Sequence, residues 1–365
     1  MSNVKIQTLT AVHIGSGETL QYGTDFVQGL TDNDYVLSVI DPRKVLALIG
    51  ENNIHQWVAS IERKEATSAV VKRFAPHAQI SDYSQRLIME WSAAKPTDTL
   101  KEHIHDGQGR PYIPGSSLKG AIRTCVLASI ANEKNGLEKN IQNSYGKVSA
   151  KIIESDLFGS DPNKDVFRFM QIGDAYFGQM REVAVRMVNI NERERRGFWD
   201  ESKPQLIEAI PPEDETEFHM KLNIEGYNIS KSKVHNLPMC MLSEESLFKT
   251  INAHTLNLLE GEIAYWEERE QDDDTQKVSL YMEKISDIVS IVKECVDGKE
   301  CVLRVGHGSG WRFITGAWAE NLDNFSSAVV PSSRPKNFKY EQYDFPKTRR
   351  VDDECELLGF VKLSR

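Results

Sequence analysis

The sequence predicts an α+β fold. Segments in which apolar and polar residues alternate with period two, as in antiparallel strands, are interspersed with segments of helical periodicity. No βαβ unit with a glycine fingerprint is present, which disfavours a doubly wound parallel sheet. At 365 residues the chain is long enough for two domains with a sizeable core.

The N-terminal third is predicted to contain strands first and helices next. Residues 3–10 (NVKIQTLT) alternate and predict a strand, and residues 13–17 then form a turn. Residues 35–40 predict a second strand that an Asp-Pro pair ends. Residues 43–100 have a mainly helical pattern, interrupted at two prolines.

The middle of the chain predicts mostly strands. Residues 132–164 are polar and indicate loop with a short helix. Residues 167–174 and 183–188 predict a strand pair, and residues 205–210 and 216–224 predict two more strands. The second of these two has the clearest alternation.

The C-terminal third predicts a helical hairpin and then a strand. In residues 243–297 apolar residues repeat at intervals of three and four on both sides of a polar segment, 271–276. Residues 301–305 are a strand that runs into a glycine-rich loop at 306–310. The two short glycine turns, HIGSG and GHGSG, are similar, and a contact between them in the folded protein is a hypothesis.

Composition excludes several classes of protein. The net charge is −10, which disfavours a free-standing, non-specific nucleic-acid binder but allows a local basic groove. No apolar run is long enough to cross a membrane and no signal core is visible, so we expect a cytoplasmic protein. The cysteines are scattered and form no C-x-x-C pair, so we expect reduced thiols, no metal site and no cofactor.

One stretch, Ile113-Pro-Gly-Ser-Ser-Leu-Lys-Gly-Ala-Ile-Arg123, predicts an anion-binding helix that runs to about residue 131. Ser116 or Ser117 would cap the helix after the Pro-Gly pair. Lys119 and Arg123 are four residues apart, share a face and lie near the positive end of the helix dipole, so an anion such as phosphate would offset their repulsion. The alternative is a well-capped surface helix with two solvated cations.

Other candidate RNA contacts lie in the glycine turns and near the C-terminus. Glycines permit close approach of backbone N–H groups to phosphate, although a tight hairpin turn explains the same pattern. His13 is a further candidate RNA contact. Trp311 and Arg312 flank the second loop and could stack on a base or pair with a phosphate of RNA. The loop itself is formed by Gly306, His307, Gly308, Ser309 and Gly310.

The segment 334–350 interleaves cations with aromatic rings, a pattern suited to single-stranded RNA, or it is an extended segment packed across the fold. Of its six cations we single out Lys347, Arg349 and Arg350. Three further arginines at 193–196 are expected in a solvated loop.

Four of these stretches together resemble the RAMP proteins of type III CRISPR–Cas effector complexes. IPGSSLKGAIR resembles the signature helix of that family. It is accompanied in order by VHIGSG (12–17), GHGSG (306–310) and, at the end, FPKTRR (345–350) with LGFVKL (358–363). The combination is most similar to the RAMP subunits that cap the 3′ end of the guide RNA in type III-A Csm complexes.

The resemblance implies tandem ferredoxin-like, RRM-like domains, at 1–190 and 191–365, with helical insertions. It implies a non-catalytic subunit for antiviral defence that binds crRNA and supports its maturation. Its expected partners are the backbone RAMP subunit and the small helical subunit of the Csm complex, with host ribonucleases as further candidates and no membrane.

Two other functions stay open. A ribonuclease could use Asp25, which follows the first glycine turn, or His13 and His307 as acid and base. The loop around Asp25 departs from that of the target-cleaving RAMP subunit, because it is shorter and lacks a Gly-Gly pair before the aspartate. A protein–protein adaptor would instead use the helical segment 243–297 as its main surface.

Overall fold

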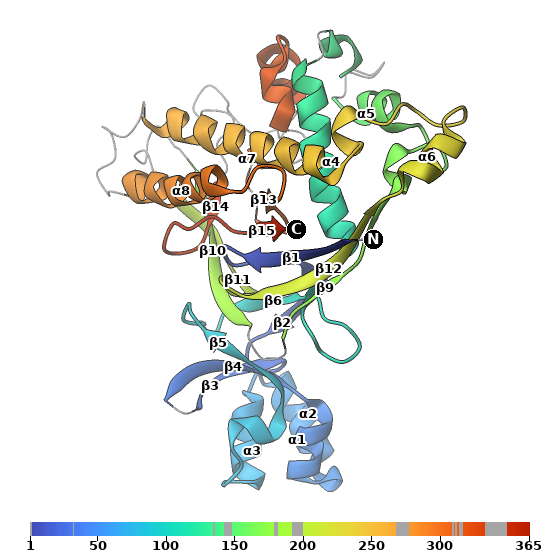
Figure 1. Cartoon of the computed structure of the whole chain (residues 1–365). Helices are drawn as coiled ribbons and strands as arrows, with labels where there is room; N and C mark the ends of the chain where they lie inside the picture. The colour runs from blue at the N-terminus through green and yellow to red at the C-terminus, as the bar shows by residue number, and fades with distance from the viewer. Residues whose placement is uncertain are drawn as a thin grey trace.

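The computed structural model describes residues 2–31, 33–133, 136–141, 148–178, 182–191, 200–267, 277–308, 310, 312–313, 317–332 and 349–365. Two curved sheets form the middle of the molecule, long helices lie above them, and a smaller helical lobe lies below (Figure 1). The predicted α+β class is confirmed.

The first sheet is antiparallel and joins the two ends of the chain. Its strand order is β13-β15-β1-β12-β8. In β1, Val4, Ile6 and Thr8 are buried while the residues between them are not, which is the alternation that predicted this strand. The five strands are β1 (Ser2–Thr8), β8 (Met170–Ile172), β12 (Glu215–Leu222), β13 (Glu300–Arg304) and β15 (Phe360–Ser364).

Two long helices pack on this sheet, as in a ferredoxin-like unit. They are α4 (Gly115–Glu133) and α7 (Glu244–Glu267), and α8 (Lys277–Glu294) lies beside α7 (Figure 1). Leu118 and Ile122 of α4 share one buried core with Val4 and Ile6 of β1. The helices α7 and α8 confirm the predicted helical hairpin, and the polar segment between them lies outside the described residues.

The second sheet has eight strands, in the order β2-β6-β11-β10-β5-β4-β3 with β14 paired to β10. Both sheets draw strands from both sides of residue 190, and the border between two domains stays a prediction. A separate two-stranded sheet joins β7 (Tyr112–Ile113) to β9 (Ala175–Tyr176). The eight strands are β2 (Gly15–Gln21), β3 (Phe26–Thr31), β4 (Asp34–Ile40), β5 (Ser84–Glu90), β6 (Thr99–His103), β10 (Val183–Asn191), β11 (Asp200–Ala209) and β14 (Arg349–Val351).

The lower lobe packs three short helices against β3 and β4 (Figure 1). Asp41 accepts hydrogen bonds from the backbone of Arg43 and Lys44, so the Asp-Pro pair that ends β4 also starts the first helix. The shorter helices of the chain are α1 (Pro42–Ile49), α2 (Ile54–Glu62), α3 (Thr67–Phe74), α5 (Lys151–Phe158), α6 (Ile224–Ser230), α9 (Val330–Ser332), and the one-turn segments Glu51–Asn53, Ile80–Tyr83, Leu137–Asn140, Val166–Phe169, Met239–Met241, Ala317–Asn321 and Phe325–Val329.

Two sequence-based expectations are wrong. The region 43–100 was expected to be mainly helical, but β5 and β6 lie in or across its second half. The stretches 167–174 and 183–188 were expected to pair with each other, but β8 pairs with β12 in the first sheet and β10 pairs with β11 in the second. Among the described helices, none is both long and apolar enough to cross a membrane.

Candidate nucleic-acid interface

The two glycine turns meet in the folded chain. The backbone N–H of His307 donates a hydrogen bond to the carbonyl of His13 at 2.9 Å. Gly306 has φ +79°, and a Cβ there would lie 2.5 Å from the same carbonyl oxygen. Only glycine therefore permits this contact, and the hypothesis that the turns touch is confirmed.

Arg304, the last residue of β13, holds the second turn in shape. Its guanidinium donates to the carbonyl oxygens of Leu358, Gly306 and His307 at 3.1, 2.7 and 2.8 Å. In the part of the chain that the structure describes, Arg304 has no carboxylate partner. Burial and the nearby Arg350 lower its pKa to about 9, so it carries its charge at neutral pH.

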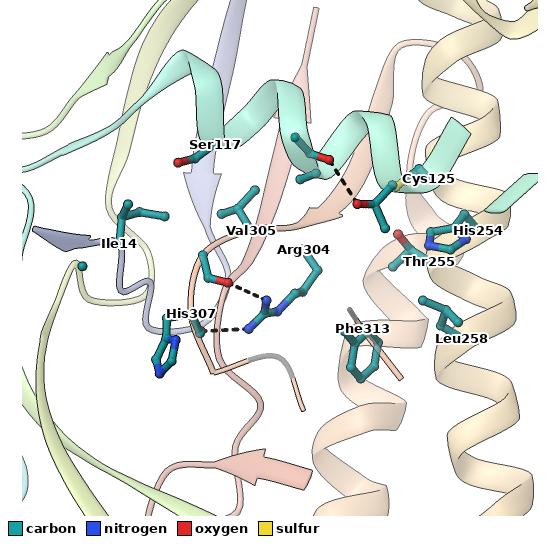
Figure 2. Close-up of a pocket in the computed structure, with 15 residues that line it drawn as sticks. Ile14, Ser117, Cys125, His254, Thr255, Leu258, Arg304, Val305, His307 and Phe313 are labelled. Carbon is teal, nitrogen blue, oxygen red and sulfur yellow. Dashed lines mark hydrogen bonds between the residues drawn. The ribbon is translucent and has the colours of Figure 1, made fainter. Parts of the chain in front are cut away.

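A cavity of about 540 Å³ opens beside this arginine, between α4, α7 and the second glycine turn (Figure 2). Ser117, Gly120 and Thr124 of α4 line one side of it, and His254 and Thr255 of α7 line another. Among the described residues that line the cavity, none is acidic. The other lining residues are Ile14, Gly15, Ala121, Cys125, Leu258, Arg304, Val305, Gly306, His307 and Phe313.

The charge of the cavity comes from arginine and not from histidine. Burial lowers the pKa of His254 to about 4. Burial, followed by Arg350 and other cations, lowers the pKa of His307 to about 4 as well. Both rings are therefore neutral near pH 7. Arg350 donates from Nη1 to Nε2 of His307 at 3.2 Å, which places a second guanidinium at the same turn.

The signature helix begins earlier than the sequence indicated. α4 starts at Gly115, so Ser116 and Ser117 lie in its first turn and the expectation that one of them caps the helix is wrong. The carboxylate of Asp174 instead accepts the N–H of Gly115 at 2.8 Å. An acid from a distant segment thus occupies the position that the helix dipole favours for an anion. A phosphate at this helix start would have to share it with Asp174.

Lys119 and Arg123 are not among the residues that line the cavity. Arg123 pairs with Asp165 at 2.8 Å and with Glu154 at 3.4 Å, and its guanidinium lies over the rings of Phe158 and Phe167. Lys119 is half-buried and forms no ion pair with the described residues; burial lowers its pKa although Asp165 acts in the opposite direction.

Two of the cations in the C-terminal part of the chain pair with acidic side chains. Arg349 is buried and pairs with the buried Glu262 of α7 at 2.8 Å. Arg312 pairs with the same Glu262 and, at 3.1 Å, with Glu320. These pairs attach the end of the chain to the helical hairpin, which agrees with the packed-segment alternative for Arg349. Several candidates lie outside the described residues: Ser309, Trp311, Lys347 and the arginines at 193–196.

His13 and Asp25 have structural partners. Nδ1 of the buried His13 lies 2.6 Å from the carbonyl oxygen of Glu208, and burial lowers the pKa of this histidine to about 4. Its ring contacts those of His103 and His307 edge-on. Asp25 accepts the N–H of Gln21 at 2.8 Å within its own turn.

Sequence reasoning missed Arg304 and His254. Arg304 was visible as a cation two residues before the glycine turn, in a strand that otherwise consists of apolar residues. His254 carried no signal, because its place at the cavity depends on how α7 packs against α4.

Comparisons with known proteins identify the family of the chain. The family model of the RAMP superfamily matches residues 5–312. The CRISPR system Cms protein Csm5 of Streptococcus thermophilus is 27% identical over 135 residues, which are 35% of this chain and 36% of that protein. The matched part therefore spans about a third of that relative's length.

Two solved structures share the fold over nearly the whole chain. One is a chain of a Csm–crRNA–target RNA ternary complex from a type III-A CRISPR–Cas system, with a TM-score of 0.75, 21% identity and full coverage of both chains. The other is Csm5 of T. onnurineus, with a TM-score of 0.65, 19% identity and coverage of 98% of this chain and 99% of that one. The chain thus belongs to the RAMP superfamily, and it is similar to Csm5 in fold and in part of its sequence.

Proposed function

We propose that this protein is a non-catalytic subunit of a type III-A Csm complex that binds crRNA and caps its 3′ end. The observation that carries the proposal is the cavity between the signature helix and the glycine turn: among the described residues its lining includes Arg304 and no acid, and Arg350 contacts the lining residue His307. The likeness to a chain of a Csm–crRNA–target RNA complex supports the same assignment.

The cavity binds the RNA backbone in this proposal. Arg304 in the wall and Arg350 beside His307 supply positive charge, and the glycine turn lets a phosphate approach the backbone closely. Ser117 adds a hydroxyl at the cavity wall. Because these groups recognise phosphate and sugar, binding is largely independent of base sequence. Lys119, Arg123 and the remaining predicted contacts form an outer set whose role is secondary to that of the arginines at the cavity.

The assembly role follows from the same likeness. We assign the backbone RAMP subunit and the small helical subunit of the complex as protein neighbours. Retention of the guide RNA end would support crRNA maturation, with host ribonucleases trimming the RNA that the subunit leaves exposed. The net charge of −10 fits a subunit that meets RNA at one local surface.

The ribonuclease alternative finds less support. Asp25 is committed to its own turn, and His13 is buried with a backbone partner. A general base must reach the proton that it abstracts, and neither group lines the cavity. His307 does line it, but Nε2 of this histidine accepts a hydrogen bond from Arg350, and burial lowers its pKa to about 4. An Asp25→Ala complex should therefore cut target RNA as the wild type does; loss of cutting would favour the enzyme.

The decisive experiment is photo-crosslinking of guide RNA carrying a 3′-terminal thiouridine in the reconstituted complex. Arg350→Glu should abolish the 3′-end crosslink to this chain. Lys5→Glu is the matched control, because Lys5 is an exposed cation on β1 that pairs with Glu215. An Arg350→Glu complex that assembles and crosslinks normally would overturn the cavity as the RNA site. Lys119→Glu, run in parallel, tests the outer set.

A further inference from the structure

A second group of chemically active side chains lies in the eight-stranded sheet, apart from the cavity. Glu102 is on β6, His105 follows that strand, Glu182 directly precedes β10 and Glu208 is on β11. Glu208 and Glu182 are 0% and 3% exposed, so two carboxylates are removed from water here. Burying carboxylates is costly unless cations or hydrogen bonds compensate each of them.

The donor atoms of Glu102, His105 and Glu208 lie close enough together for one coordination sphere, and Glu182 lies beside them as the hydrogen-bond partner of His105. Nε2 of His105 lies 2.9 Å from Oε2 of Glu182 and 4.0 Å from Oε1 of Glu208. Single donor atoms of Glu102, His105 and Glu208 all lie within 4.8 Å of one another. Around an octahedral cation with ligands at about 2.1 Å, neighbouring ligands are about 3.0 Å apart and opposite ligands about 4.2 Å apart.

One oxygen of the cluster lacks a partner. Oε1 of Glu182 is buried and accepts no hydrogen bond from the described residues, while Oε2 of the same carboxylate bonds His105. The unpartnered oxygen therefore belongs to a carboxylate already directed at the cluster. A buried acceptor left in this state costs about 1–3 kcal/mol, and an electrophile at the cluster would remove that cost.

The acids of the cluster outnumber its permanent cation. Arg86 donates to Glu208 at 2.7 and 2.9 Å and to Glu102 at 3.0 Å, and among the described residues it is the arginine or lysine that pairs with these acids. Burial opposes a charge on His105, but the hydrogen bond with Glu182 and the charge of that acid raise its pKa, so a bound metal ion would displace the proton between the two. Each carboxylate oxygen has two lone pairs, so the oxygens that bond Arg86 can still coordinate.

We propose that Glu102, His105 and Glu208 bind one divalent metal ion of the Mn²⁺ class, and that Glu182 stands beside them and orients His105. One imidazole among carboxylates favours a first-row ion over Ca²⁺. The ion would connect β6 and β11 next to His103 and His13, whose rings lead toward the glycine turns. The proposal concerns residues that do not line the RNA cavity, and it does not depend on the proposed function.

The test is a titration of the chelator-treated full chain with Mn²⁺, followed by electron paramagnetic resonance of the free ion. Wild type should bind one Mn²⁺ per chain and melt at a higher temperature when it is bound. Glu182→Gln keeps the shape of the side chain and should weaken binding about tenfold or more. Glu18→Gln, an exposed glutamate on β2 of the same sheet, should bind as wild type does.

Glu102→Gln provides a second variant should Glu182→Gln fail to fold, because Glu102 is partly exposed. Its binding should weaken in the same way. Wild type that binds no Mn²⁺ at millimolar concentration would overturn the proposal and leave the cluster as a protonated His105–Glu182 pair beside Arg86. Equal binding by wild type and both cluster variants would overturn it too, by placing the ion elsewhere.

Discussion

At the scale of single residues, the partners of an arginine decide whether it is available to RNA. Arg123 and Arg349 have carboxylate partners, while Arg304 is held by backbone carbonyls alone among the described residues. The sequence shows which residues are cations and how they are spaced. It does not show that Asp165, 42 residues after Arg123, folds back to pair with it.

Arg123 and Lys119, the two cations of the signature helix, should therefore differ in their contribution to stability. Arg123→Ala leaves Asp165 without its cation and removes the contacts with Phe158 and Phe167. Because the pair is partly exposed, we expect the free energy of unfolding to fall by about 1–3 kcal/mol in urea titrations. Lys119→Ala, on the same face of the same helix, should change it by about 0.5 kcal/mol or less. The reverse ranking would show that Arg123 is not structural.

At the scale of elements, the start of α4 is fixed by close packing against the end of β8. A Cβ on Gly115 would lie 2.2 Å from the carbonyl oxygen of Ile172. This oxygen is a backbone atom, so it cannot turn aside as the end of a flexible side chain could. Gly120 lies in the same helix, and a Cβ there would meet nothing within 4 Å. Sterics therefore require the first glycine and leave room for a side chain at the second.

Substituting each glycine by alanine should change stability in opposite directions. Gly115→Ala should lower the free energy of unfolding by about 2 kcal/mol or more, since backbone must shift to admit the methyl group. Gly120→Ala should raise it by about 0.5–1 kcal/mol, the difference in helix propensity. Urea titration followed by circular dichroism measures both. A loss of stability for Gly120→Ala would contradict the open surface at that position.

Elements with strong internal periodicity were predictable, and elements defined by their neighbours were not. The apolar repeat of α7 and α8 and the alternation of β1 follow from burial of one face. β2 has almost no buried residue, so no hydrophobic pattern marks it, and its extended state comes from pairing with β6. The site divides in the same way: the glycine turn was visible in the sequence, whereas His254 reaches the cavity only through the packing of α7.

At the scale of the whole molecule, a neutral, partly buried histidine makes folding sensitive to acid. Burial lowers the pKa of His254 to about 4, against about 6.5 in an unfolded chain. Between these values the unfolded chain binds a proton that the folded chain does not, so stability decreases as the pH falls from 6.5 toward 4.

His254→Phe should weaken this pH dependence. The loss of unfolding free energy between pH 7 and pH 5 should be smaller than in wild type by about 2 kcal/mol. Urea titrations at the two pH values measure the difference. His55→Phe is the control, because His55 is exposed on α2, and it should leave the pH dependence unchanged. Equal pH dependence in wild type and His254→Phe would show that the pKa of His254 does not change on folding.

The acidic chain and its positive cavity together predict how salt acts on RNA retention. A chain of net charge −10 gains no attraction for RNA from its overall field, so a few contacts at the cavity must set the salt dependence.

In reconstituted complexes, Arg350→Gln should weaken guide-RNA retention. It should also reduce the slope of the logarithm of the RNA association constant against the logarithm of the salt concentration by about 0.7, the value for one contact to a single strand. Arg365→Gln, which removes a cation paired with Glu244, should leave the slope unchanged. Weaker retention with an unchanged slope would mean that Arg350 acts by holding His307, because a lost phosphate contact must also release fewer counterions.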